Sequence, residues 1–141
     1  ISFFCAVIPS KLGSKEILEK YGVHEGELEL FRYRGNGWPG DLTFETKEGS
    51  QYQMSYRESW GKVLNKYIQP RCKICADGIG DNADIVCADA WDTSEDGYPI
   101  IDSVDIESKG LSLVIVRTSE GKAVIDKAEI NNVLINKKNF E

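Results

Sequence analysis

Apolar and polar residues alternate along several stretches of this chain, as they do in strands that are buried on one face. Two such stretches flank Glu48–Gly49, a turn sequence that predicts a hairpin. Two apolar runs, Ile85–Val86 and Leu111–Val116, predict central strands of a sheet. The expected strands are Ser2–Ile8, Glu27–Arg34, Leu42–Thr46, Gln51–Tyr56, Ala83–Ala88 and Leu111–Arg117.

Helical spacing of apolar residues predicts three helices, around Ile17–Tyr21, Trp60–Tyr67 and Val124–Ala128. Ser14 is the expected N-cap of the first, and Thr118–Ser119 can cap the third.

A last strand at Val133–Asn136 would complete a strand–helix–strand unit. We therefore expect one α/β domain over residues 1–141, with helices packed on a mixed sheet. Because the pattern is already under way at Ile1, we also expect a domain excised from a larger protein.

Composition narrows the class of partner. The chain has 141 residues, of which 41% are hydrophobic, so it can form a core of its own. A formal charge of −6 argues against nucleic acid or an anionic membrane as the partner. A single histidine, His24, excludes hydrolytic triads of the usual kind. No apolar run approaches the roughly 20 residues of a transmembrane helix, and we expect a cytoplasmic protein.

The cysteines are the strongest candidate chemistry. Cys72 and Cys75 form a Cys-x-x-Cys pair that can direct two thiolates at one soft metal centre. Pro70 is expected to end the preceding helix, and Gly78 and Gly80 allow a tight path afterwards. The pair alone is compatible with zinc, an iron–sulfur cluster, a redox dithiol or a disulfide. The cysteines are few and unevenly spaced, which favours a metal or cluster over disulfides.

Arg32–Gly40, with the sequence RYRGNGWPG, is the second unusual stretch. Three glycines and a proline in nine residues specify a defined, non-repetitive backbone. Such a loop can approach a phosphate or ring-bearing cofactor closely. It is equally compatible with a turn that a buried Trp38 anchors.

Basic residues cluster around the second predicted helix of this otherwise acidic chain. They are Arg57, Lys62, Lys66, Arg71 and Lys73. A solvated helix face is one interpretation, and a docking surface for an acidic protein is the other.

Six segments occur in the order in which one family carries them. They are FC (Phe4–Cys5), RYRGNGWPG (Arg32–Gly40), SYRESWGKVL (Ser55–Leu64), PRCKICAD (Pro70–Asp77), ADIVCADAW (Ala83–Trp91) and GLSLVIVRT (Gly110–Thr118). On these segments the chain resembles the C-terminal domain of the beta subunit of coenzyme F-420 hydrogenases and dehydrogenases. The resemblance covers nearly the whole chain.

The resemblance implies an iron–sulfur flavoprotein oxidoreductase with FAD and a [4Fe-4S] cluster. Cys72 and Cys75 match the family's cluster-ligating pair, and Cys5 matches the single cysteine of its FC segment. The remaining ligand of the family lies in a segment upstream of Ile1 that this sequence does not contain, so we expect that this chain by itself does not complete the cluster or the flavin site. The resemblance does not assign Cys87 as a ligand. The positions that the resemblance places near the flavin are Arg34, Gly35, Gly37, Trp38, Pro39, Gly40 and Asp89.

From the same resemblance we expect electrons to pass between an acidic one-electron carrier such as ferredoxin and a hydride carrier or substrate. Cys5, Cys72 and Cys75 should then converge, with the loop from Cys72 to Asp81 mobile when the site is empty. One alternative is a binding module in which the four cysteines hold zinc. Another is a member of the family that has lost its cofactors and acts as an interaction domain.

Overall fold

The structure, a computed structural model, describes residues 1–101 and 109–135. The chain forms two compact units, which are described separately. Unit 1 comprises Ile1–Cys5, Asp77–Asp89 and the chain from Ser112 onward, and unit 2 comprises Ala6–Ala76 and Ala90–Leu111. Among the described residues, none of the helices has the length and apolar character that a membrane-spanning helix needs.

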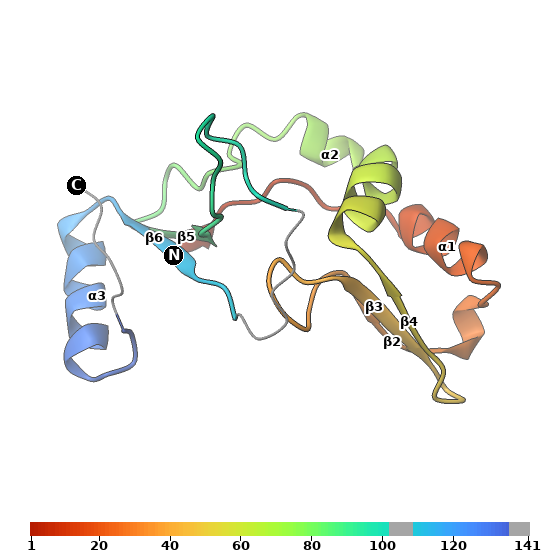
Figure 1. The fold of residues 1–141 in the computed structure, drawn as a ribbon. Coiled ribbons are helices and arrows are strands. Elements are labelled where there is room, and N and C mark those ends of the chain that lie inside the picture. The colour runs from red at the N-terminus through yellow and green to blue at the C-terminus, as the bar shows by residue number, and fades with distance from the viewer. Residues whose placement is uncertain (102–108, 136–141) are drawn as a thin grey trace. The chain divides into compact units, whose positions relative to one another are not determined.

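Unit 2 is built around an antiparallel sheet of three strands in the order β2-β3-β4, with helices beside it (Figure 1). The hairpin of β3 and β4 has Phe44 opposite Tyr52 and Leu42 opposite Met54. The elements of this unit are α1 (Lys11–Lys20), the 3₁₀ turn η1 (Glu25–Glu27), β2 (Leu28–Arg32), β3 (Leu42–Thr46), β4 (Gln51–Met54), the π-helix η2 (Arg57–Val63), the 3₁₀ helix η3 (Leu64–Tyr67) and α2 (Pro70–Lys73).

The core of unit 2 lies between this sheet and the helices. Alternate residues of β3 are buried, as the two-residue period predicts. They meet Ile17 and Leu18 of α1 and Val63–Leu64 at the junction of η2 and η3. Helices pack closely here, since a Cβ on Gly13 would lie 3.2 Å from both Leu64 and Tyr67.

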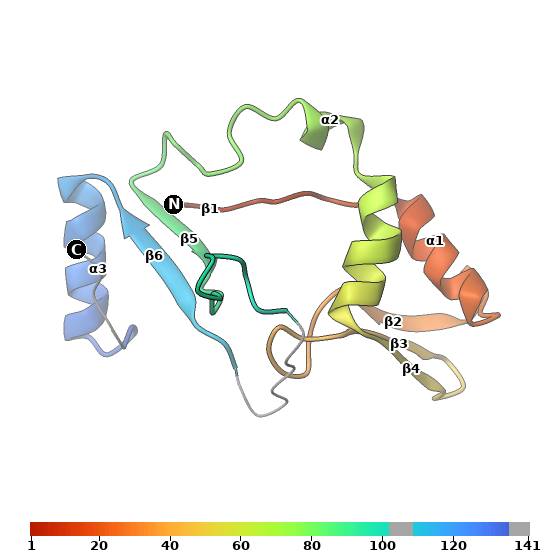
Figure 2. The same ribbon diagram turned by 45° about the horizontal axis from the view of Figure 1, so that its top comes forward.

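Unit 1 contains a mixed sheet in the order β1-β5-β6, with β5 in the middle (Figure 2). β1 (Ser2–Phe3) pairs parallel to β5 (Ile85–Asp89), and β5 pairs antiparallel to β6 (Ser112–Val116). Helix α3 (Ser119–Ile130) follows β6. The Thr118 hydroxyl accepts a hydrogen bond from the Gly121 amide, as its predicted capping role requires.

The α/β class, the hairpin and the strands at Ile85–Val86 and Leu111–Val116 are confirmed, although the second begins at Ser112. The expectation of one sheet is wrong, because the strands form two. Periodicity reports which face of a strand is buried and not which strand lies beside it. Only Ser2–Phe3 of the first predicted strand pairs, and Val133–Ile135 form no strand. Asn136 lies outside the described residues.

Three local predictions also need correction. Ser14 lies inside α1, and Ser10 holds the N-cap position with an extended backbone. The helix predicted at Trp60–Tyr67 is a π-helix that begins at Arg57 and continues as a 3₁₀ helix. Pro70 begins α2 instead of ending a helix, because the first position of a helix does not use its N–H.

Candidate cluster ligands and cofactor loop

Cys72 and Cys75 lie in and just after α2, within unit 2. The Cys72 amide donates to the Gln69 carbonyl over 2.9 Å, and the Cys75 amide donates to the Cys72 carbonyl over 3.4 Å. This single turn places both thiols on one short segment. Cys75 is exposed, Cys72 is half-buried, and neither forms a disulfide. Two accessible soft donors at this spacing are chemically suited to an iron–sulfur cluster or zinc.

The segment Ile8–Ser10 runs beside the chain that leads into α2. Pro9 and Ile68 form an isolated antiparallel bridge. The Ser10 amide donates to the Tyr67 carbonyl over 2.6 Å, and the Gln69 amide donates to the Ile8 carbonyl over 3.0 Å. These contacts direct the Ile8 amide at the Cys72 sulfur, 3.4 Å away.

Cys5 and Cys87 belong to unit 1. Parallel pairing sets Phe3 opposite Cys87, and the Phe4 amide donates to the Cys87 carbonyl over 2.8 Å. The chain then leaves the strand, and the Cys5 amide donates to the Gly78 carbonyl over 2.9 Å. Both Cys5 and Cys87 are half-buried. The position of Cys5 is therefore fixed by β5 and by the glycine loop that precedes it.

That glycine loop is tied down by Arg117, which follows β6. The Arg117 guanidinium donates to the carbonyls of Gly80 and Ile79 and lies 3.7 Å from the Asp81 carboxylate. Gly80 has a φ of +62°, and a Cβ there would lie 2.8 Å from Ser2. Glycine is therefore required where the loop passes β1.

The three predicted ligands fall in different units: Cys5 in unit 1, and Cys72 and Cys75 in unit 2. Within each unit, the described residues hold no group of three His, Cys, Asp or Glu side chains gathered as for a metal ion. The convergence of Cys5 with the Cys-x-x-Cys pair stays a prediction.

The glycine-rich loop at Arg34–Gly40 folds on itself between β2 and β3. Asn36, Gly37 and Gly40 have positive φ, and the Trp38–Pro39 peptide bond is cis. A Cβ on Gly40 would lie 2.9 Å from backbone atoms of both Gly35 and Gly37, so no larger residue fits there. Pro39 and Gly40 are buried.

Arg34 stands at the centre of an aromatic cluster in unit 2. Its guanidinium carbon lies 5.1, 5.7 and 5.4 Å from the ring centroids of Trp38, Tyr56 and Trp91. Its Nε donates to the Pro39 carbonyl over 2.9 Å. Cation–π contacts of this length are attractive, so Arg34 links the loop to the rings around it.

The rings of this cluster also contact one another and Gly110. The centroids of Trp38 and Trp91 are 4.8 Å apart, and those of Tyr56 and Trp91 are 5.5 Å apart. A Cβ on Gly110, whose φ is +67°, would lie 2.5 Å from the Trp38 ring. The indole of Trp38 is therefore closely packed against both the Trp91 ring and the backbone at Gly110.

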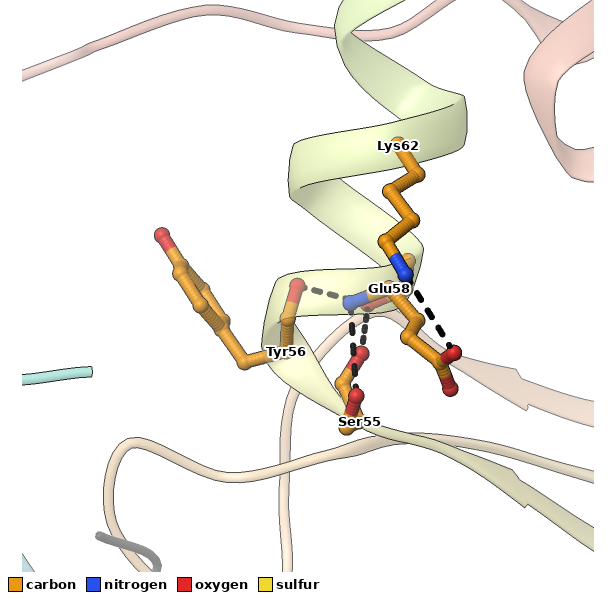
Figure 3. Close-up of polar contacts among 5 residues, drawn as sticks. Ser55, Tyr56, Glu58 and Lys62 are labelled. Carbon is orange, nitrogen blue, oxygen red and sulfur yellow. Dashed lines mark hydrogen bonds and ion pairs between the residues drawn. The ribbon is translucent and has the colours of Figure 1, made fainter. Parts of the chain in front are cut away.

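Tyr56 is held in place by the start of η2 (Figure 3). The buried Ser59 hydroxyl donates to the carbonyls of Ser55 and Tyr56, over 2.8 and 3.2 Å. The Glu58 amide donates to the Ser55 hydroxyl over 3.3 Å, and the Glu58 carboxylate lies 3.7 Å from the Lys62 amine. The two serine side chains thus bond to the backbone of this first turn, Ser59 as a donor to carbonyls and Ser55 as an acceptor from an amide.

Of the residues predicted to lie near a flavin, the structure brings six together in one loop: Arg34, Gly35, Gly37, Trp38, Pro39 and Gly40. The seventh, Asp89, is exposed at the end of β5 in unit 1. The anchoring role considered for Trp38 is supported, since Arg34, Trp91 and Gly110 surround its half-buried ring. A flavin role for this loop stays a prediction.

Sequence reasoning missed the parts that Ile8, Tyr56 and Trp91 play. Tyr56 and Trp91 are 35 residues apart and Ile8 and Cys72 are 64 apart, so no local pattern joins them. The only hint in the sequence was that Tyr56 and Trp91 are aromatic.

Residues 1–139 match the family described as the C terminus of the beta subunit of coenzyme F420 hydrogenase/dehydrogenase. No curated protein matches the chain. Among solved structures, the chain is similar to a chain of the xenon-derivatised F420-reducing [NiFe] hydrogenase complex from Methanosarcina barkeri, with 21% identity and a TM-score of 0.48. That similarity covers 92% of this chain and 37% of the hydrogenase chain, so this chain spans little more than a third of its length. On the match over residues 1–139, the chain belongs to the family of C-terminal domains of coenzyme F420 hydrogenase/dehydrogenase beta subunits.

Proposed function

We propose that this chain is the part of an iron–sulfur flavoprotein oxidoreductase that supplies cluster ligands and a wall of the flavin site. Two electrons and a proton leave or arrive as hydride on a hydride carrier such as coenzyme F-420. The same two electrons pass one at a time to or from a ferredoxin-like carrier, and the proton is exchanged with water. The observation that carries this proposal is the family match over residues 1–139.

Cys72, Cys75 and Cys5 would hold the cluster. Their donor chemistry fits it, because all three are free thiols and Cys72 already accepts an amide hydrogen bond at its sulfur. A [4Fe-4S] cluster, when bound, accepts and releases single electrons. This chain contributes the turn of α2 that presents two sulfurs, and the strand pairing and glycine loop that fix Cys5.

The loop at Arg34–Gly40 would approach the flavin. Gly37 has a positive φ, no side chain and a half-buried position, which suits the close approach of a phosphate or a ring. Arg34 acts here by positioning, because its guanidinium packs against three rings. The protein would act in the cytoplasm, between a hydride carrier such as coenzyme F-420 and a ferredoxin-like carrier.

The test is metal and flavin analysis of the whole protein, purified without oxygen. We expect a brown protein with iron, sulfide and flavin. Cys75→Ala should lose most of the iron, whereas Cys87→Ala should keep it, since Cys87 is not among the proposed ligands. A protein with zinc near one atom per chain and no sulfide would establish the zinc-binding alternative instead.

A further inference from the structure

The sulfur of Cys72 has a defined hydrogen-bond donor that lies far away in the sequence. The Ile8 N–H points at Cys72 Sγ with an N···S distance of 3.4 Å. As a free thiol, Sγ also lies 4.0 Å from the Ile8 carbonyl oxygen. A sulfur bound to iron has lost its proton and can only accept, so the amide contact is the one that persists.

The backbone of Ile8 is fixed on both sides of this contact. Its carbonyl accepts from the Gln69 amide, and Pro9 and Ser10 bind the chain at Ile68 and Tyr67. The side chain of Ile8 is 57% exposed and is not what holds the segment. The contact is therefore made by the N–H, and the side chain can be changed without removing it.

We propose that the Ile8 N–H tunes the reduction potential of the cluster that Cys72 ligates, an inference that rests on the proposed function. Adding an electron makes a cluster more negative and its sulfurs better acceptors. A donor aimed at a ligand sulfur therefore stabilises the reduced form more than the oxidised form. The Ile8 amide, through its contact with Cys72, raises the reduction potential of the cluster.

The test compares two variants of the whole protein in a redox titration that is followed by electron paramagnetic resonance. Ile8→Pro removes the N–H and keeps the carbonyl that Gln69 binds. Residue 8 already precedes Pro9, which favours the extended backbone that a proline can adopt. Ile8→Ala truncates the side chain and keeps the N–H. We expect a more negative midpoint for Ile8→Pro and an unchanged one for Ile8→Ala.

A second measurement does not depend on the proline variant folding. Protein grown with ¹⁵N-isoleucine should show, in pulsed resonance spectra of the reduced cluster, a ¹⁵N coupling that Ile8→Ala loses. Comparison with this variant isolates residue 8 from Ile74, which lies between the two cysteines.

Equal midpoints in wild type and Ile8→Pro, with full iron content in both, would overturn the proposal. So would labelled spectra that do not differ between wild type and Ile8→Ala. A whole protein that assembles no cluster at all would instead defeat the proposed function, which keeps the two failures apart.

Discussion

Arg34 is a packing residue as much as a charged one. Its guanidinium lies within 6 Å of three ring centroids, and its Nε binds a carbonyl of its own loop. A lysine keeps the charge but has no flat face and no Nε to donate. Arg34→Lys should therefore lower the free energy of unfolding by about 1–2 kcal/mol.

Tryptophan fluorescence during urea unfolding measures this loss, because all three tryptophans, Trp38, Trp60 and Trp91, lie in unit 2. Arg32→Lys is the matched control. Arg32 is exposed on β2, and the change should stay within about 0.5 kcal/mol. Equal effects of the two substitutions would mean that the aromatic cluster does not depend on the guanidinium.

Helix α3 packs against the start of β5 at Gly121. A Cβ on Gly121 would lie 2.7 Å from the Asp84 carbonyl oxygen and 3.0 Å from Ile85. Alanine normally stabilises a helix by about 1 kcal/mol over glycine, but here the clash outweighs that gain. Gly121→Ala should loosen α3 from β5, and its amides should exchange with solvent about tenfold faster, equivalent to roughly 1.4 kcal/mol.

Gly61→Ala in η2 is the control for that substitution. The nearest atom to its added Cβ would be Arg57 Cγ at 3.9 Å, an ordinary contact. Hydrogen exchange in η2 should be unchanged or slower. Unaltered exchange of α3 in Gly121→Ala would show that the helix can shift without cost.

Helices α1 and η3 are joined by a hydrogen bond that responds to pH. The Tyr67 hydroxyl donates to the Glu16 carboxylate over 2.6 Å. That bond, with lesser help from Lys66 and Lys20, lowers the pKa of Glu16 below its usual 4.5. A lowered pKa stabilises the fold above about pH 4.5, and that stability is lost as the pH falls through the folded-state pKa.

Tyr67→Phe should therefore make the free energy of unfolding fall less steeply between neutral pH and about pH 3. The measurement is urea unfolding at several values of pH. Tyr21→Phe is the control, because the Tyr21 hydroxyl donates to the Gln53 carbonyl, which does not titrate. An acid dependence that is the same in all three proteins would contradict the coupling.

On the scale of the whole molecule, this acidic chain carries five basic residues, here called the basic face, along the segment that leads to its cysteine pair. Arg57, Lys62, Lys66, Arg71 and Lys73 are all exposed along η2, η3 and α2, which leads directly to Cys75. Lys62 is 3.7 Å from Glu58, and such a surface pair neutralises only part of the charge. We expect an acidic one-electron carrier to dock on this face.

Reversal of Lys62 and Lys66 to glutamate should slow reduction of the whole protein by ferredoxin at low salt, with little change in stability. Reversal of Lys15 and Lys47, which lie in the same unit on α1 and just after β3, changes the net charge equally. It removes an ion pair with Glu25 and a hydrogen bond to the Gly26 carbonyl, but should slow the reduction less. The difference should fade near 1 M salt, where the screening length is roughly 3 Å. If neither reversal changed the rate of reduction by ferredoxin, Lys62 and Lys66 would be only part of a solvated helix face.

The sequence by itself determined the local structure and the family. The alternation over Leu42–Thr46 and Gln51–Met54, the apolar run of β6 and the capping of α3 by Thr118 depend on residues that are neighbours along the chain. The six segments in order identified the family, which the match over residues 1–139 confirms. Boundaries were less well determined, since Ser10 and not Ser14 precedes α1.

Only the tertiary structure decided which strands share a sheet and what surrounds the candidate site. Pairing β1 with β5, Ile8 with Cys72, and Arg34 with Trp91 joins positions that chain folding brings together across dozens of residues. Such contacts depend on the shape and hydrogen-bonding geometry of the assembled elements, and periodicity carries no record of them. The sequence therefore identified Cys72 and the loop at Arg34–Gly40 as candidates, and the fold determined that Ile8 and Trp91 contact them.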